Sequence, residues 1–328
     1  MSEVIVTHDV DLAVHKLLNS HLCAIPTETV YGLAANALDQ DAIGRVFAAK
    51  GRPTDHPLIV HVAHADVANQ WITEFPDWAV RLTNSFWPGP LTIVGNRSEL
   101  ASDVITGGQQ TVAVRVPEHP LVQQLLHKLL EQGVLGIVAP SANKFGHVSP
   151  TTAEHVMNDL GAYLGDHDDV ILDGGICPVG IESTIILATT DTPIILRPGI
   201  ITPKQIQKIT GLKPITKYDQ DIRVSGNLAA HYSPNARVEI VQDINTCVFS
   251  QPAGFLATSE IETPPGLTRL ASPGDAASFA ATLYGSLRHG DILGLPVIYI
   301  VVPSDDEIGI ALFDRISRAA HQEKDVHP

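Results

Sequence analysis

The strongest constraint on the fold is the alternation of short apolar runs with segments of helical periodicity. An apolar run at 22–25 reads as a buried strand and ends at Pro26. Apolar positions between 43 and 47 then recur at helical spacing. Lys50 and Gly51 give this helix a basic last turn and a residue that tolerates positive φ. A strand, a polar turn and a helix in this order are typical of α/β proteins.

The same alternation continues to about residue 200. Strands are expected at 58–62, 91–94, 111–116, 134–138, 170–172, 183–188 and 194–196, and helices at 77–86, after Pro120 and at 153–160. Some of these strands follow each other without a helix between them, so the sheet should be mixed rather than purely parallel. We therefore expect an α/β domain with a mixed twisted sheet over residues 1–210.

Residues 211–237 interrupt this pattern. They are rich in Gly, Pro, Lys, Asp and Ser, with little apolar period. A connection of about 25 residues is long for a passive linker, so a function is expected for it. The α/β pattern restarts over 238–328, with strands expected at 238–241, 254–257 and 297–302, a helix from Asp275 and a last helix through Leu312. No catalytic motif is visible in this second domain, which favours a binding or lid role.

Composition limits the class of function. The net charge of −15 over 328 residues argues against a protein that coats nucleic acid through bulk charge. Three widely spaced cysteines predict neither a disulfide framework nor a metal site, and the 15 histidines form no metal motif. The N-terminus has no signal-peptide pattern, and no apolar run is long enough to span a membrane. These features predict a cytoplasmic protein without membrane contact.

Basic side chains fall at the ends of the expected elements. Lys50 and Arg52 follow the first helix, and Arg197 ends a strand. In the strand at 111–116 the valines share one face, which places Thr111 and Arg115 together on the other, about 13 Å apart. An arginine on such a face is suited to bind a carboxylate through two parallel hydrogen bonds. The alternative interpretation is an edge strand with a solvated arginine.

Other polar residues have both a functional and a structural interpretation. Ser141 and Asn143 follow a strand end, where α/β sheets place ligands, but an Asx-type turn explains them equally well. Ser149 precedes a helix and either belongs to its N-terminal cap or faces a pocket. His61, taken alone, is better explained as structural. The sequence contains no P-loop, no strand-bounded GxGxxG and no nucleophile elbow, so any ATP site must use scattered side chains.

Several stretches keep one order along the chain. They are PTETVYGL at 26–33, KGRPTDHPL at 50–58, WPGPLT at 87–92, VAVRVP at 112–117 with His119 and Pro120, PSAN at 140–143, ESTI at 182–185, RPG at 197–199 and HYSP at 231–234. Together they resemble the L-threonylcarbamoyladenylate synthase family in its long form. The resemblance implies a YrdC-like mixed twisted sheet with helices, a linker at 211–237 that folds over the active site, and a smaller Rossmann-like α/β domain at 238–328.

The resemblance also implies a reaction. L-threonine, bicarbonate and ATP, with Mg²⁺, would yield threonylcarbamoyl-AMP and pyrophosphate, and the product would pass to enzymes that modify tRNA adenosine. Threonine would be held by Thr29, His61, Arg115, the backbone at Ala139, and Ser183. ATP would be held by Arg52, His56, Thr111, Ser141, Asn143, Ser149, Arg197, His231 and Tyr232. Lys50 and Arg52 would be the catalytic residues, with Lys50 and Asn143 near the phosphates and Mg²⁺.

The implied chemistry fits a site without a nucleophile. Threonine and bicarbonate give an unstable carbamate whose oxygen attacks the α-phosphorus while pyrophosphate leaves. Such a step needs alignment and charge neutralisation rather than covalent catalysis. A closed, dry pocket would protect the carbamate from decay, which gives the long linker a role.

Two departures and two alternative functions remain. Long-form members often carry a PGM-like segment with a basic residue before HYSP, whereas this chain reads SGNLAA at 225–230. Nothing in the second domain suggests tRNA docking, so direct tRNA binding stays open.

A non-enzymatic RNA-binding or ribosome-assembly factor is disfavoured by the acidic charge and the absence of RNP aromatics. A carbamoyl-transfer enzyme with another acceptor is disfavoured by the threonine-side residues and the lack of CxxC pairs.

Overall fold

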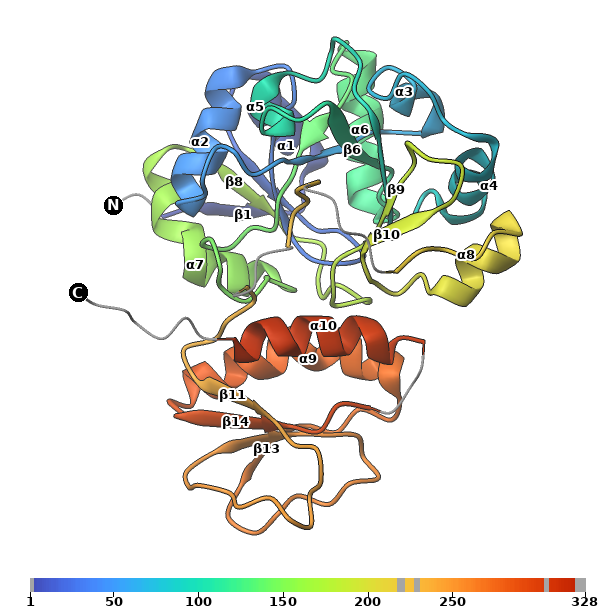
Figure 1. Ribbon diagram of the computed structural model, residues 1–328. Helices are drawn as coiled ribbons and strands as arrows, with labels where there is room; N and C mark the ends of the chain where they lie inside the picture. Colours follow the sequence, from blue (N-terminus) through green and yellow to red (C-terminus); the bar gives the residue numbers. More distant parts are fainter. Residues whose placement is uncertain (1–2, 217–221, 227–230, 304–306, 322–328) are drawn as a thin grey trace, which may run out of the picture.

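A computed structural model describes residues 3–216, 222–226, 231–303 and 307–321. The chain forms a larger α/β body and a smaller one, each built on its own sheet (Figure 1). Helices α9 (Ala276–Ile292) and α10 (Gly309–Ala320) form the layer of the smaller body that faces the larger one. No helix within the described ranges is both long and apolar enough to cross a membrane.

Within the described ranges the large sheet has ten strands. They are β1 (Ile5–Thr7), β2 (Cys23–Ile25), β3 (Gly32–Asn36), β4 (Ile59–His61), β5 (Leu91–Asn96), β6 (Thr111–Arg115), β7 (Ile137–Val138), β8 (Val170–Leu172), β9 (Thr184–Leu187) and β10 (Ile194–Arg197), in the spatial order β1-β8-β2-β3-β7-β4-β6-β5-β9-β10. Parallel pairs such as β4 with β6 alternate with antiparallel pairs such as β5 with β6. The expected mixed α/β sheet is therefore confirmed.

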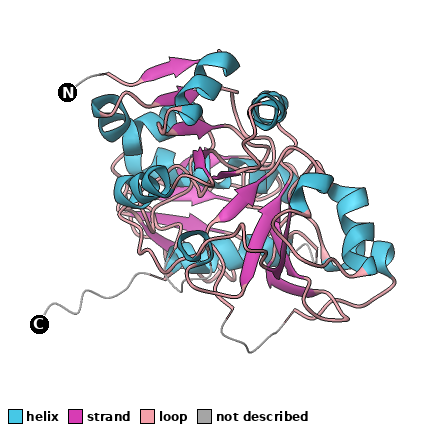
Figure 2. Cartoon of the chain, turned by 90° about the horizontal axis from the view of Figure 1, so that it is seen from above, coloured by secondary structure: helices cyan, strands magenta, loops and turns pink. Residues whose placement is uncertain are grey.

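Helices cover both faces of this sheet, as Figure 2 shows from above. They are α1 (Val10–Leu18), α2 (Gln40–Lys50), α3 (Ala65–Ala68), α4 (Asp77–Phe86), α5 (Asp103–Thr106), α6 (Pro120–Glu131), α7 (Ala153–Asp166) and α8 (Pro203–Thr210). One buried cluster joins α2, α4 and α7 to the sheet, and another joins α1 and α6 to its other face. The side-chain alternation within each strand supplies both clusters, since Leu33 belongs to the first and Ala34 to the second.

The smaller sheet contains β11 (Arg237–Ile240), β12 (Gly254–Leu256), β13 (Thr268–Ala271) and β14 (Val297–Ile300). Their order is β11-β14-β12-β13, and all the pairs are parallel. Asp275 begins α9 as expected, because its side chain accepts a hydrogen bond from the backbone N–H of Ser278 at 2.7 Å. A small parallel sheet with helices agrees with the expected second α/β body.

Two sequence-based expectations were wrong in detail. The strand expected at 134–138 is limited to β7, because the N–H of Val134 bonds to the carbonyl of Leu129 and closes the end of α6. The polar stretch that starts at Pro26 connects two strands rather than leading directly to a helix. Gly32 begins β3, which pairs antiparallel with β2. Elements with short or polar sequences, including β1, α1, β3, α8 and β13, were not expected from the sequence.

Candidate functional site

Ten of the residues predicted for the site line one cavity between the large sheet and the linker. They are Thr29, Arg52, His61, Arg115, Ala139, Ser141, Ser183, Arg197, His231 and Tyr232. The fold explains this gathering, because β4 and β6 are parallel neighbours that pair His61 with Arg115. The strand that carries Arg115 lies between β4 and β5, and the side chain is 4% exposed, so the edge-strand alternative is excluded.

Arg115 is held by three groups at one end of this cavity. Its Nη2 donates to Glu28 Oε1 at 2.6 Å, its Nη1 to Thr29 Oγ1 at 2.9 Å, and its Nε to the carbonyl of Gly89 at 3.3 Å. Glu28 is fixed in turn by the backbone N–H of Glu118 at 3.0 Å. Each terminal nitrogen of Arg115 keeps a second N–H, and such a pair can bind a carboxylate side by side.

His61 is a neutral acceptor beside Arg115. Burial lowers the pKa of His61 to about 3, and the positive charge of Arg115 acts in the same direction. Its Nδ1 lies 3.2 Å from the carbonyl of Ile59. Because a carbonyl can only accept, Nδ1 carries the proton and Nε2 is left as an acceptor. The hydroxyl of Ser183 is 2.7 Å from that of Thr92, so this end of the cavity offers both donors and acceptors.

Arg52 and Arg197 form the cationic end of the cavity, and Arg197 Nη2 also donates to Ser183 Oγ at 3.1 Å. Both are buried, and within the described part of the chain neither forms an ion pair with a carboxylate. Arg197 donates to the backbone carbonyl of Ser183 through Nε and Nη2, at 3.1 and 3.0 Å. Burial lowers the pKa of Arg52 to about 10 and also lowers the pKa of Arg197. Two buried guanidinium groups without a carboxylate partner are costly in isolation and are suited to bind an anion.

Lys50 does not line the cavity. Its Nζ donates to the carbonyls of Ser141 at 2.5 Å and Asn143 at 2.6 Å, so it fixes the loop that follows β7. Burial lowers the pKa of Lys50 well below its usual range, and the nearby charge of Arg52 adds to this effect. The amide Nδ2 of Asn143 is bound to the carbonyls of Lys144 and His147, at 2.7 and 2.8 Å. This arrangement fixes the direction of the Asn143 side chain.

The other predicted residues outside the cavity lie around it. Thr111 lines a small hollow next to the cavity, and the ring of His56 contacts that of Phe145 with centroids 5.3 Å apart. Ser149 does not cap α7, because Thr152 does so through its bond to the N–H of His155. Instead Ser149 Oγ donates to Glu182 Oε1 at 2.7 Å.

Four buried polar atoms in this region have no hydrogen-bond partner among the described residues. They are Arg52 Nε, Asn143 Oδ1, His231 Nδ1 and the hydroxyl of Tyr232. An unsatisfied buried group typically costs about 1–3 kcal/mol, and such groups are rare except where a ligand binds. Burial raises the pKa of Tyr232 to about 12 and lowers that of His231 to about 3, so both side chains are neutral.

Residues 222–226 of the linker, which we call the strap, close the cationic end. Arg52 Nη2 donates to Ser225 Oγ at 3.3 Å, and Arg223 pairs with Asp55 at 3.0 Å. Val224 is buried against Ile59 in an apolar cluster on the large sheet. The remaining cavity has a volume of about 50 Å³, far below the roughly 300–1,000 Å³ of ligand pockets. The segments 217–221 and 227–230 of the linker lie outside the described residues.

Several residues that matter to this geometry were not singled out from the sequence. Glu28 lies within the PTETVYGL stretch, and Glu182 begins ESTI, but neither was assigned a role. Ser225 was noted only as part of a departure from the PGM-like pattern. Each of these side chains bonds to a residue that is far away in the sequence but close in the folded chain. Sequence spacing does not reveal such partners.

Comparisons with known proteins identify the family of this chain. The Sua5/YciO/YrdC family, described as "Telomere recombination", matches residues 15–199, and the family described as "Threonylcarbamoyl-AMP synthase, C-terminal domain" matches residues 201–321. The threonylcarbamoyl-AMP synthase of Pyrococcus abyssi is 38% identical over 314 residues, covering 91% of this chain and 90% of that protein. The Bacillus subtilis protein of the same name is 36% identical, covering 93% and 90%.

Solved structures show the same likeness over both bodies. The crystal structure of P. abyssi Sua5 complexed with L-threonine matches with a TM-score of 0.81 and 33% identity, and 97% of each chain is covered. A His-Tyr to Ala-Ala variant of the same protein also matches with a TM-score of 0.81. The paired family domains, the high coverage and the shared fold lead to one conclusion: this chain belongs to the threonylcarbamoyl-AMP synthase family of ATP-using, nucleotidyltransferase-type enzymes.

Proposed function

We propose that the cavity binds L-threonine at its Arg115 end and ATP at its Arg52 and Arg197 end, and that the enzyme joins them with bicarbonate to form threonylcarbamoyl-AMP and pyrophosphate. The observation that carries this assignment concerns three guanidinium groups in a single cavity. Two are buried without a carboxylate partner among the described residues, and one is paired with Glu28. The first two suit the phosphates, and the third suits a carboxylate.

On the threonine side, the two remaining N–H groups of Arg115 would bind the carboxylate. The ammonium group needs acceptors, which His61 Nε2 and the carbonyl of Ala139 would supply. Thr29 and Ser183 carry hydroxyls that can orient the threonine hydroxyl. Glu28 would keep the guanidinium of Arg115 in place.

On the nucleotide side, ATP would take over the donors that the strap now uses. Arg52 and Arg197 would bind phosphate oxygens, and the unpartnered polar atoms of His231 and Tyr232 would find ligand partners. Ser141, Ser149, Thr111 and His56 surround this end of the site. Lys50 would act by holding the loop of Ser141 and Asn143 in position.

The chemical step then needs little from the protein beyond alignment. The carbamate formed from threonine and bicarbonate attacks the α-phosphorus, the bond to the β-phosphate oxygen breaks, and pyrophosphate leaves. Arg52 would neutralise the negative charge that develops on the phosphate oxygens. A closed cavity would exclude water that competes for the carbamate.

Mg²⁺ fits the donor set that this end of the site presents. Asn143 Oδ1 is a buried oxygen without a partner among the described residues, and its amide is fixed by two bonds from Nδ2. Mg²⁺ is commonly held by one or two protein oxygens together with substrate phosphates and water. When bound there with ATP, it would neutralise phosphate charge.

The domain boundaries also remain a proposal. We place the catalytic domain at 1–210, the linker at 211–237 and the second domain at 238–328. The contacts of Ser225 with Arg52 and Arg197 support a linker that folds over the active site. The three free cysteines fit a reducing compartment such as the cytoplasm, which we propose for the reaction. The product would then pass to enzymes that modify tRNA.

ATP/pyrophosphate exchange tests the proposed function. Exchange that requires both threonine and bicarbonate would support the synthase. Retention of RNA without exchange would instead support an RNA-binding factor, and exchange without a need for threonine would point to another acceptor.

A further inference from the structure

A buried carboxylate joins the two bodies of the molecule beside the cavity. Glu182 Oε1 accepts from Ser149 at 2.7 Å, and Oε2 accepts from Tyr284 at 2.9 Å and from Arg315 Nε at 2.8 Å. Burial acts to raise the pKa of Glu182, but the charges of Arg315 and Arg197 outweigh it and lower the pKa to about 2. Glu182 is therefore ionised, and two of its three partners come from the second body.

Arg315 contacts more than Glu182. It is fully buried, its Nη2 donates to the carbonyl of Pro198 at 2.9 Å, and its Nη1 bonds to Asp314. Its guanidinium also lies 5.4 Å from the ring centre of Tyr232. Pro198 follows Arg197 directly, so one side chain of α10 touches the backbone next to Arg197 and the ring of Tyr232.

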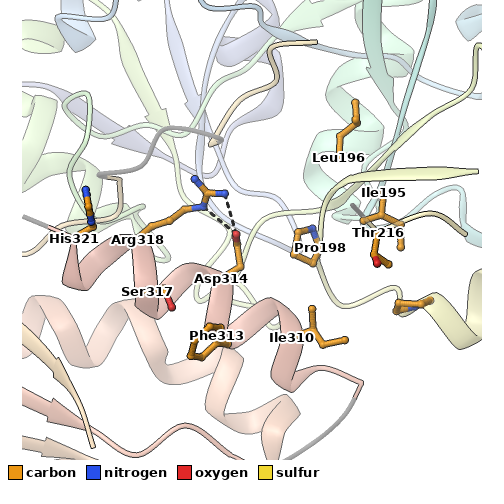
Figure 3. A pocket seen from close by; sticks show the side chains of 11 residues that line it. Ile195, Leu196, Pro198, Thr216, Ile310, Phe313, Asp314, Ser317, Arg318 and His321 are labelled. Atoms are coloured by element: carbon orange, nitrogen blue, oxygen red, sulfur yellow. Dashed lines mark hydrogen bonds and ion pairs between the residues drawn. The ribbon is translucent and has the colours of Figure 1, made fainter. Parts of the chain in front are cut away.

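Figure 3 shows the surroundings of this contact. Asp314 of α10 is paired with Arg318 and lies across from Pro198, at a cavity of about 620 Å³ between α10 and β10. Asp314 thus fixes one side of the Arg315 guanidinium, while Glu182 and Pro198 fix the others. A planar guanidinium bound on three sides has a fixed orientation.

Tyr284 of α9 completes the arrangement. Its ring stacks on that of Tyr232, with centroids 5.5 Å apart and an interplanar angle of 25°. The same side chain donates to Glu182. The second body thus contacts the linker residue Tyr232 from two sides, through Tyr284 and Arg315.

We propose that Arg315 and Tyr284 are positioning residues for the nucleotide end of the site. Arg315 positions Arg197 through the carbonyl of Pro198. Arg315 and Tyr284 together position Ser149 through Glu182, and both contact the ring of Tyr232 directly. The proposal rests on the proposed function, because Arg197, Ser149 and Tyr232 are the groups assigned there to ATP. It gives the second domain a defined part in ATP binding, although neither residue lines the cavity.

Two mild variants test this role. Tyr284→Phe removes one hydroxyl and keeps the stacked ring, and Arg315→Lys keeps the charge but loses the planar group. Each should raise the KM for ATP in the exchange assay by about 10-fold or more, since small misplacements of binding groups have large effects. The KM for threonine should rise much less than the KM for ATP, because Arg115 and His61, which bind the charged groups of threonine in the proposal, have no bond to Glu182. Among the described residues, only Ser183, the residue after Glu182, links the two ends.

A matched control breaks a different contact between the same two bodies. Lys204 of α8 pairs with Glu307, which lies just before α10, and neither residue lines the cavity or bonds to Glu182. Lys204→Ala should therefore leave the KM for ATP unchanged while removing an ion pair across the interface. Thermal unfolding of all three variants separates loss of stability from loss of positioning.

The outcomes are distinct. A selective rise in the KM for ATP in folded Tyr284→Phe, absent in Lys204→Ala, supports the proposal. Equal changes in both KM values, or wild-type kinetics in folded Tyr284→Phe, would overturn it. If Arg315→Lys does not fold, Tyr284→Phe alone decides. Wild-type protein without threonine-dependent exchange would contradict the proposed function itself, which keeps the two failures apart.

Discussion

Arg197 donates through Nη1 to the backbone carbonyl of Ser225 at 2.8 Å. A cation assigned to ATP is thus already bound by the linker of the same chain. Arg52 makes a similar bond to the Ser225 hydroxyl, at 3.3 Å. A triphosphate bound to these two guanidinium groups, as proposed, would compete with the strap for the N–H groups that Ser225 now occupies.

Gly226 ends the strap in a conformation that other residues resist, with a φ of 86°. A Cβ at this position would lie 2.3 Å from the hydroxyl of Tyr232. Gly226→Ala should weaken strap closure by roughly 1 kcal/mol or more, and limited proteolysis should cleave the linker faster. Gly211→Ala is the matched control, since Gly211 has a φ of 74° but no atom near its added Cβ. Equal cleavage in both variants would mean that the clash with Tyr232 has no effect on closure.

Arg115→Ala should raise the threonine requirement far more than the ATP requirement. A hydrogen bond to a charged group contributes about 1.5–3 kcal/mol, so the KM for threonine should rise by roughly 10- to 150-fold. Steady-state exchange kinetics with each substrate varied in turn would measure this. Arg97→Ala is a suitable control, because Arg97 pairs with the exposed Asp103 away from the cavity. Parallel increases for both substrates would place Arg115 elsewhere in the mechanism.

Arg52→Met should separate activity from stability. Exchange should fall by about 100-fold or more, because a preorganised charge on the phosphates is lost. The melting temperature should stay the same or rise, since a buried cation without a carboxylate partner is replaced by an apolar side chain. Near-wild-type exchange would refute the phosphate assignment. A large fall in melting temperature would show that Arg52 mainly stabilises the fold.

Stability should fall as the pH drops below about 6.5. Burial lowers the pKa of His61 and of His231 to about 3, whereas unfolded histidine titrates near 6.5. The unfolded state therefore binds more protons between these values, and each histidine reduces the free energy of unfolding by up to about 1.4 kcal/mol per pH unit. Urea unfolding at pH 7, 6 and 5 would measure this slope. His231→Gln should make the slope shallower, and an unchanged slope would argue against a buried neutral His231.

The sequence predicted most of the fold because its strands are apolar and its longer helices have clear periodicity. The sequence also predicted the face of the strand on which Arg115 lies, since the alternation of side chains is a local property. The partner of Arg115 could not be predicted from the sequence. Glu28 lies 87 residues earlier, and only the strand order of the sheet brings the two together.

Lys50 shows a different limit. A lysine at a helix end next to an arginine suggested contact with phosphates, but its ammonium group binds two backbone carbonyls of another loop. The pair of Glu182 and Arg315, 133 residues apart, joins the two bodies, each built on its own sheet. Motifs indicated residues that gather at one cavity, whereas the partner to which each side chain donates depended on the packed structure.

The covalent attachment of the strap has a consequence for how the enzyme responds to substrate supply. A tethered competitor has a fixed effective concentration, whatever the amount of enzyme. If Arg197 and Arg52 bind ATP as proposed, the observed affinity for ATP would equal the intrinsic affinity multiplied by the fraction of molecules in which Ser225 has left both arginines. Substitutions among the five strap residues would in this way change the ATP concentration that half-saturates the enzyme, without altering any group proposed to touch the nucleotide.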